Sequence, residues 1–132
     1  MRLRLKLKRY DGPTIEAVIE SLRTAGEIND EKFTGFWIES RMHTNPVGDV
    51  ILRRELKEKG VPDPIIEAAL QGKAQNYDEY TVAFNMAGER FKRLVKLDRR
   101  KALKRLYDYL LRRGFDYDIV KRVIDAVMDE NG

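Results

Sequence analysis

Apolar positions along the chain recur at an offset of 54 residues. The stretch LRRELKEKGVPDPIIEAAL, from Leu52 to Leu70, has the same order of apolar, charged and glycine positions as LYDYLLRRGFDYDIVKRVI, which begins at Leu106. Gly60 aligns with Gly114, and the same offset aligns four apolar pairs: Leu56 and Leu110, Val61 and Phe115, Ile65 and Ile119, Ile66 and Val120. Self-similarity of this kind indicates an array of similar structural units.

Each copy of the repeat predicts a helix, a tight turn and a second helix. Two leucines stand four residues apart in the first part, which is the spacing of one helical face. Gly60 and Gly114 follow basic residues, as expected at a helix C-terminus, where glycine adopts the left-handed conformation and cations suit the carbonyl end. Asp63 and Asp116 are good starts for the second helix.

A further helix is predicted before each of these pairs. NDEKFTGFWIESRM and DEYTVAFNMAGERFKRLVK both begin with acidic residues, which favour a helix N-terminus. The predicted buried faces are, in the first, Phe33, Phe36, Trp37 and Ser40, and in the second, Tyr80, Ala83, Phe84, Ala87, Phe91 and Leu94. Each complete unit therefore contains three helices.

The chain is predicted to be all-α, with tandem three-helix repeats that form an elongated, curved array. We expect a partial first repeat at residues 1–28, a second repeat at 29–72 and a third at 73–132, with LQGKAQNYD as the link. The partial repeat is a weaker copy from Leu7 to Leu22. Residues 1–9, MRLRLKLKR, alternate with the period of a strand instead.

Composition places few limits on function. Of the 132 residues, 42% are hydrophobic, which allows a core, and 36% are charged, which indicates a densely charged helical surface. The chain has no cysteine, which excludes disulfides and thiolate metal sites. The sequence shows no membrane span and no signal peptide, so a cytoplasmic location is the default expectation.

One segment in the second half of the chain is strongly basic. The net charge is +4, and the segment from Arg90 to Arg105 holds nine lysines or arginines against one acid, Asp98. From Asp116 onward, five acids face only Lys121 and Arg122. The basic segment is either an ordinary solvated surface or a surface that faces an anionic partner.

Catalytic chemistry has little support in the sequence. His43 is the only histidine and is expected in a polar loop. The chain has no glycine-rich phosphate loop, no histidine pair for a metal and no nucleophile elbow. We therefore expect no enzyme activity, no metal and no cofactor.

Several of these stretches together resemble the RecX family of bacterial regulatory proteins. The resemblance rests on GEINDEKFTGFWIESRM, which includes Ser40 and Arg41, on ILRRELKEKGV and IIEAAL, and on LLRRGFDYDIVKRVI. It covers nearly the whole chain, and its motifs are in the family's order and spacing. Members of the family have three tandem three-helix units, so the resemblance implies that this chain starts within the first.

The resemblance implies a monomeric, non-enzymatic regulator of the RecA recombinase in DNA repair, homologous recombination and the SOS response. Family members bind the RecA filament on DNA and inhibit its ATPase and strand exchange, and some also contact single- or double-stranded DNA. Candidate contact residues for RecA or DNA are Arg41, Arg53, Arg54, Lys57, Lys92, Arg93, Lys96, Arg99, Arg100, Lys101, Arg112 and Arg113. The alternative is a basic helical module that binds nucleic acid by itself.

Overall fold

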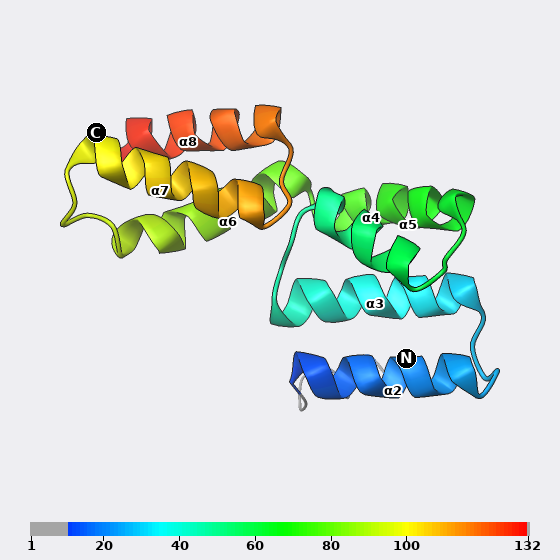
Figure 1. Cartoon of the computed structure of the whole chain (residues 1–132). Helices are drawn as coiled ribbons and strands as arrows, with labels where there is room; N and C mark the ends of the chain where they lie inside the picture. The colour runs from blue at the N-terminus through cyan, green and yellow to red at the C-terminus, as the bar shows by residue number, and fades with distance from the viewer. Residues whose placement is uncertain (1–10, 132) are drawn as a thin grey trace. The chain divides into compact units, whose positions relative to one another are not determined.

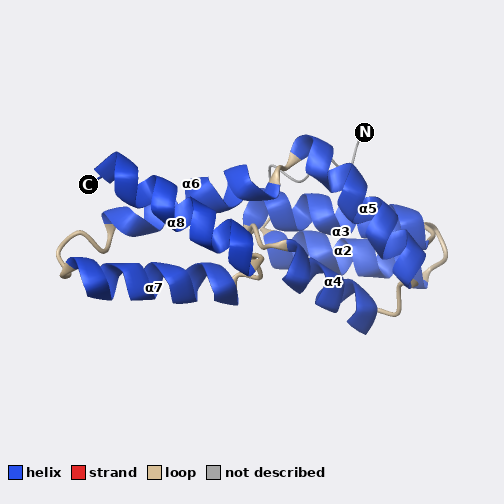
Figure 2. Cartoon of the chain, turned by 90° about the horizontal axis from the view of Figure 1, so that it is seen from above, coloured by secondary structure: helices blue, strands red, loops and turns tan. Residues whose placement is uncertain are grey.

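The computed structural model describes residues 11–131, and these fold into helices and turns (Figure 2). The expected strand period at residues 1–9 lies outside the described part of the chain. The seven helices are α2 (Gly12–Thr24), α3 (Asp30–Thr44), α4 (Asp49–Glu58), α5 (Asp63–Asn76), α6 (Glu79–Lys92), α7 (Arg99–Arg112) and α8 (Tyr117–Asn131) (Figure 1). The all-α prediction is confirmed for residues 11–131.

Short polar side chains set the N-termini of four helices. Asp11, Asn29, Asp78 and Asp98 are in extended conformations and accept hydrogen bonds from backbone N–H groups in the first turns of α2, α3, α6 and α7. Each cap satisfies backbone donors that have no partner within the helix. These caps explain why acidic or amide residues precede the apolar faces in the sequence.

The chain divides into two compact units, and boundaries between them fall before α4, inside α4 and inside α5. The first unit contains the described residues up to Pro46 and Arg53–Lys73. In it, α2 packs against α3 (Figure 1), and Gly12 lies so close to Thr44 that a Cβ on the glycine would be 2.8 Å from the threonine hydroxyl. Its buried residues include Ile19, Phe33, Leu56 and Ile66, each fully removed from solvent.

The second unit contains Val47–Leu52 and the described residues from Ala74 onward. Helices α6, α7 and α8 pack against one another around a single apolar core. On α6 the fully buried side chains are Ala83 and Ala87, whose small size allows neighbouring helices to approach closely. Most of the larger buried side chains come from α7 and α8, and Leu94 and Phe115 join them from the turns.

The aligned glycines end α4 and α7 in the same way. Gly60 and Gly114 have φ angles of +82° and +89°, in the left-handed region. The N–H group of Val61 donates to the Leu56 carbonyl at 3.0 Å, and that of Phe115 donates to the Leu110 carbonyl at 3.3 Å. This is the Schellman pattern, so the predicted glycine caps are confirmed. A third cap of this kind, at Gly26 with φ +77°, was not predicted.

Two local details differ from the sequence-based expectation. The stretch LQGKAQNYD does contain a boundary between the units, between Lys73 and Ala74, but α5 continues through most of it to Asn76, because alanine, glutamine and lysine are good helix formers. His43 was expected in a loop, but it lies in the last turn of α3. Its Nε2 is 3.0 Å from Oε1 of Glu39, one turn earlier on the helix.

We predict that Gly114→Ala destabilises the protein more than Gly60→Ala does. Both substitutions put a side chain at positive φ, at a cost of about 1 kcal/mol. At Gly60 the added Cβ meets nothing within 4 Å, whereas at Gly114 it would lie 2.9 Å from the backbone nitrogen of Ile51. The clash raises the expected loss at Gly114 to about 2–4 kcal/mol.

Urea unfolding followed by far-UV circular dichroism measures both losses. Equal losses for the two variants would show that the close approach of Ile51 adds nothing to the left-handed strain.

Candidate functional site

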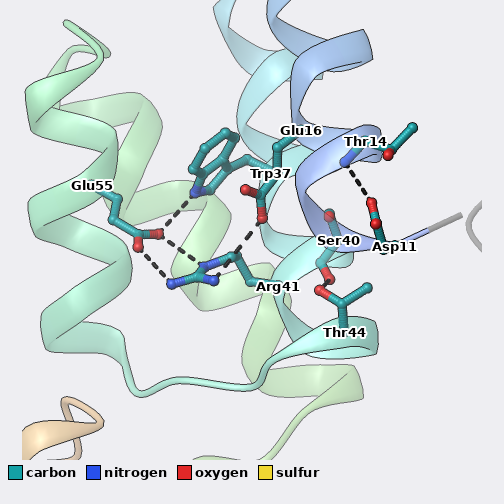
Figure 3. A network of polar contacts seen from close by, with 8 residues as sticks. All are labelled: Asp11, Thr14, Glu16, Trp37, Ser40, Arg41, Thr44 and Glu55. Carbon is teal, nitrogen blue, oxygen red and sulfur yellow. Dashed lines mark hydrogen bonds and ion pairs between the residues drawn. The ribbon is translucent and has the colours of Figure 1, made fainter.

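A polar network in the first unit centres on the carboxylate of Glu55 (Figure 3). Its Oε1 accepts hydrogen bonds from Trp37 Nε1 at 3.0 Å and from Arg41 Nε at 3.2 Å. Its Oε2 accepts from Arg41 Nη2 at 2.7 Å. The arginine therefore holds the carboxylate with two parallel bonds, the strongest arrangement for this pair. Trp37 and Arg41 stand one turn apart on α3, and Glu55 reaches them from α4.

A second carboxylate, that of Glu16 on α2, approaches the same guanidinium at 4.0 Å (Figure 3). The side chains of Arg41, Glu55 and Glu16 are only about a fifth exposed, at 17%, 20% and 21%. Partial burial raises the pKa of Glu16, and the charge of Arg41 acts in the opposite direction. The main role that the geometry gives to Arg41 is to connect helices of its own unit.

Cations also cover the aromatic residues of the first unit. The Arg23 guanidinium lies 4.5 Å from the ring centre of Phe33, and the Lys59 ammonium lies 5.1 Å from that of Trp37. Arg23 also donates to the Lys59 carbonyl at 2.8 Å, next to the Gly60 turn. These contacts join α2, α3 and the end of α4 and stabilise the unit.

The other candidate cations of the first unit are near its surface. Arg53 pairs with Glu67 at 2.7 Å, and Lys57 lies 3.6 Å from Asp63. Arg54 is exposed. Exposed pairs of this kind contribute little to stability, so these side chains can exchange their partners for another molecule at small cost.

The basic segment of the second unit runs from the end of α6, through a turn, to the start of α7. Its candidates are all exposed: Lys92, Arg93, Lys96, Arg99, Arg100 and Lys101. The single acid, Asp98, is the N-cap of α7 and accepts from the backbone N–H of Arg100 at 2.8 Å. Lys92 forms an ion pair with Glu89 at 2.9 Å, and both side chains are exposed. The segment therefore presents cations that its own acid does not neutralise.

The structure brings two of the candidates, Arg93 and Arg112, to one hollow in the second unit. It adds Arg90, Arg105 and Asp108, which were not among the candidates. The sequence does place residues 105, 108 and 112 on one face of a helix, by their spacing. It does not show that Arg90 and Arg93 face them, which only the packed structure reveals. Arg113 is half-buried, unlike the exposed Arg112, and its backbone carbonyl accepts a hydrogen bond from Gly48 N–H at 2.7 Å.

Residues 11–131 contain neither a cluster suited to a metal ion nor a helix suited to cross a membrane. Within them, no group of histidine, cysteine, aspartate or glutamate side chains has an arrangement that could hold a metal ion. None of the helices described is both long and apolar enough to cross a membrane.

Comparison with known proteins identifies the two repeats. The family model described as RecX, second three-helix domain, matches residues 29–70, and that described as RecX, third three-helix domain, matches residues 77–124. The regulatory protein RecX of Prosthecochloris aestuarii is 37% identical over 128 residues, which cover 96% of this chain and 82% of that protein. The regulatory protein RecX of Amycolatopsis mediterranei is 31% identical over the whole chain and 75% of its own length.

A solved structure has a similar fold. The crystal structure of a regulatory protein RecX matches with a TM-score of 0.66 and 22% identity. The match covers 92% of this chain and 61% of the other.

We predict that Glu55→Gln destabilises the first unit by about 1–2 kcal/mol, because an amide cannot accept from Trp37 and both arginine donors at once. Glu67→Gln removes an exposed partner of Arg53 and serves as the matched control, with little or no effect expected. Urea unfolding followed by Trp37 fluorescence measures both. A Glu55→Gln variant as stable as the parent would contradict the importance of the network.

The raised pKa of Glu16 predicts a pH effect. A group whose pKa is higher in the folded state contributes stability that is complete below its unfolded value, near 4.5, and is lost as pH rises through the folded value. The variant Glu16→Gln has no such loss. Its melting temperature relative to the parent should therefore increase between about pH 4 and about pH 7. A difference that stays constant across this range would contradict the prediction.

Proposed function

Because the chain belongs to the RecX family of regulatory proteins, we propose that it binds the RecA filament on DNA and inhibits its ATPase and strand exchange. The observation that carries the proposal is the match of both three-helix domains, over residues 29–70 and 77–124, to the family. The relatives are named regulatory proteins, and we extend that role to RecA as the partner, in DNA repair, recombination and the SOS response.

The proposed contact surface is the basic segment of the second unit. Its cations are exposed, and Asp98, the one acid among them, accepts hydrogen bonds from backbone N–H groups as the N-cap of α7. A filament on DNA carries phosphates, and clustered cations gain both association rate and counterion release near them. A surface whose clustered cations are exposed therefore suits a protein that binds a nucleoprotein filament.

The first unit offers a second, smaller set of contacts. Arg53, Arg54 and Lys57 lie at or near the surface of α4, and their pairs with Glu67 and Asp63 cost little to exchange. Arg41 is not included in this contact surface, because its guanidinium is hydrogen-bonded to Glu55. We propose that it acts on binding indirectly, by keeping α3 and α4 together.

The proposal includes regulation by binding alone, without catalysis by this chain, and action as a monomer in the cytoplasm, where RecA works. We also propose that the functional repeats have the boundaries expected from the sequence, 29–72 and 73–132, preceded by the partial repeat at 1–28.

We predict that changing Lys92, Arg93, Arg99 and Arg100 together to Gln weakens binding to RecA filaments on single-stranded DNA about tenfold or more. Glutamine keeps helix propensity and side-chain length, so the fold should persist. Inhibition of the RecA ATPase should fall in parallel, and the difference from the parent should shrink as salt is raised. Filament binding and ATPase rates at two salt concentrations provide the measurement.

The control is Lys32→Gln with Lys121→Gln, which removes two exposed cations outside the basic segment. It should inhibit nearly as well as the parent. A folded quadruple variant with full inhibition would show that the basic segment is only a solvated surface. The surface of Arg53, Arg54 and Lys57 would then be the better candidate. If the parent protein itself neither bound RecA filaments nor slowed their ATPase, the RecA proposal would be contradicted.

A further inference from the structure

Helix α2 of the first unit has an exposed face that carries no charge. A groove of about 680 Å³ follows this face. Its one charged lining residue, Glu27, lies beyond the end of the helix. The other lining residues are Pro13, Thr14, Ala17, Val18, Ser21, Leu22 and Ala25. In a chain of which 36% of the residues are charged, the solvent side of a helix normally carries charges.

The charged residues of α2 are turned toward the rest of the first unit. Each of the three forms an ion pair within that unit, and none lines the groove. The pairs are Glu16 with Arg41 at 4.0 Å, Glu20 with Lys59 at 3.0 Å, and Arg23 with Asp30 at 2.8 Å. The groove side of α2 is therefore left uncharged while the side that meets its neighbours holds the charge.

The repeat provides an equivalent helix for comparison. Helix α2 begins GPTIEAVIESL and α5 begins DPIIEAALQGK, so Ile15 aligns with Ile66 at an offset of 51 residues. The 54-residue offset of the repeat aligns Ile66 with Val120 of α8. All three of these residues are buried, so the alignment matches the inward sides of the three helices.

The same face has a different environment in α8 and in α2. The alignment pairs Val18 with Val123 and Leu22 with Val127. The two α8 valines are buried in the core that α8 forms with α6 and α7, whereas Val18 is 44% exposed and Leu22 is half-buried. A face that is covered by a helix in the second unit is thus open along α2, and Val18 and Leu22 form its apolar row.

The helix that packs on α8 indicates what kind of surface fits the apolar row. Helix α6 packs against α8 and contributes two fully buried alanines one turn apart, Ala83 and Ala87. Small residues at this spacing let two helices approach closely. Beside the apolar row, α2 has small residues at the same spacing: Ala17, Ser21 and Ala25. One α2 helix therefore offers both sides of such a contact.

We propose that the chain self-associates through this face, with α2 of one copy packed against α2 of a second copy about a two-fold axis. In such an interface the same surface lies on both sides, so charges near the axis would face like charges. The open face of α2 avoids this repulsion because the three charges of the helix are turned away from it. A polyanion or a strongly charged protein surface finds no complementary charge there.

The pair is weak and concerns the free protein. A single pair of 13-residue helices buries less surface than the roughly 1,200 Å² of a stable complex, so we expect a dissociation constant on the order of 10–100 µM. Dilute protein is then monomeric, in agreement with the proposed action of a monomer on RecA filaments. Self-association needs neither RecA nor DNA and uses no residue of the basic segment, so either proposal can fail without the other.

Sedimentation equilibrium of the full chain, at concentrations from about 5 to about 500 µM, tests the proposal. The mean mass of the parent should rise from that of one chain toward that of two. Val18→Glu places like charges in the interface and should weaken the association about tenfold or more. The matched control, Val95→Glu, adds the same charge at a valine of the second unit that is 61% exposed, and it should associate as the parent does.

The absence of cysteine from the chain allows an independent test. Val18 is at the midpoint of α2, so a two-fold axis through the middle of the face brings it close to its own copy. Two cysteines form a disulfide when their Cα atoms are within about 7 Å. With diamide as oxidant, Val18→Cys should form a cross-linked dimer about tenfold faster than Val95→Cys, whose thiols meet only by collision. Equal rates would contradict the proposed interface.

Three further results would overturn the proposal. A parent that stays monomeric, with no change of melting temperature in Val18→Glu, would leave the face open to water or to a different protein. A monomeric parent whose melting temperature falls in Val18→Glu but not in Val95→Glu would show that another segment of the same chain covers the face. Equally strong association of the parent and Val18→Glu would place the interface elsewhere on the molecule.

Discussion

The left-handed glycine at the end of α4 and α7 is the constraint on which each helical unit depends. The helix that ends there must reverse so that the next one can cover its apolar face, and only a residue without Cβ enters this conformation at low cost. At Gly114 the constraint is steric as well as conformational, because Ile51 fills the space where a side chain would begin. Val61 and Phe115, the residues after the two glycines, are buried. Each turn thus fixes the position of the next helix through both a hydrogen bond and an apolar anchor.

The charged residues, more than a third of the chain, have two distinct physical roles. In the first unit several are partly buried and held by more than one partner, as in the bonds of Arg41 to Glu55 and the placement of Lys59 over Trp37. In the second unit the basic segment lies at the surface, and its acid is engaged with backbone N–H groups at the start of α7. The same residue types therefore stabilise one part of the protein and leave the other with an excess of positive charge. This difference makes the second unit the stronger candidate for an anionic partner.

The hollow between α6 and α7 combines this charge with a shape. Exposed lysines and arginines attract any polyanion, and the interaction is diffuse. In the hollow, guanidinium groups converge from the end of α6 and from α7, and that of Arg90 is held against Tyr109, so positive charge is concentrated at one place.

Much of this fold could be read from the sequence, because its determinants are local. The four-residue spacing of leucines, the glycine after a basic helix end and the capping aspartates act over a few residues, so the sequence alone determined the helices, their turns and the family. The helix through residue 76 was missed because a glycine at position 72 and polar neighbours resemble a linker, although Lys73 is buried. Only the tertiary structure decided what the charged residues do. The pairing of Arg41 with Glu55 spans 14 residues, and the arginines of the hollow come from two helices, so no local pattern distinguishes them from an ordinary solvated surface. The packing of one helix against another, which depends on the whole apolar core, determines which charges meet.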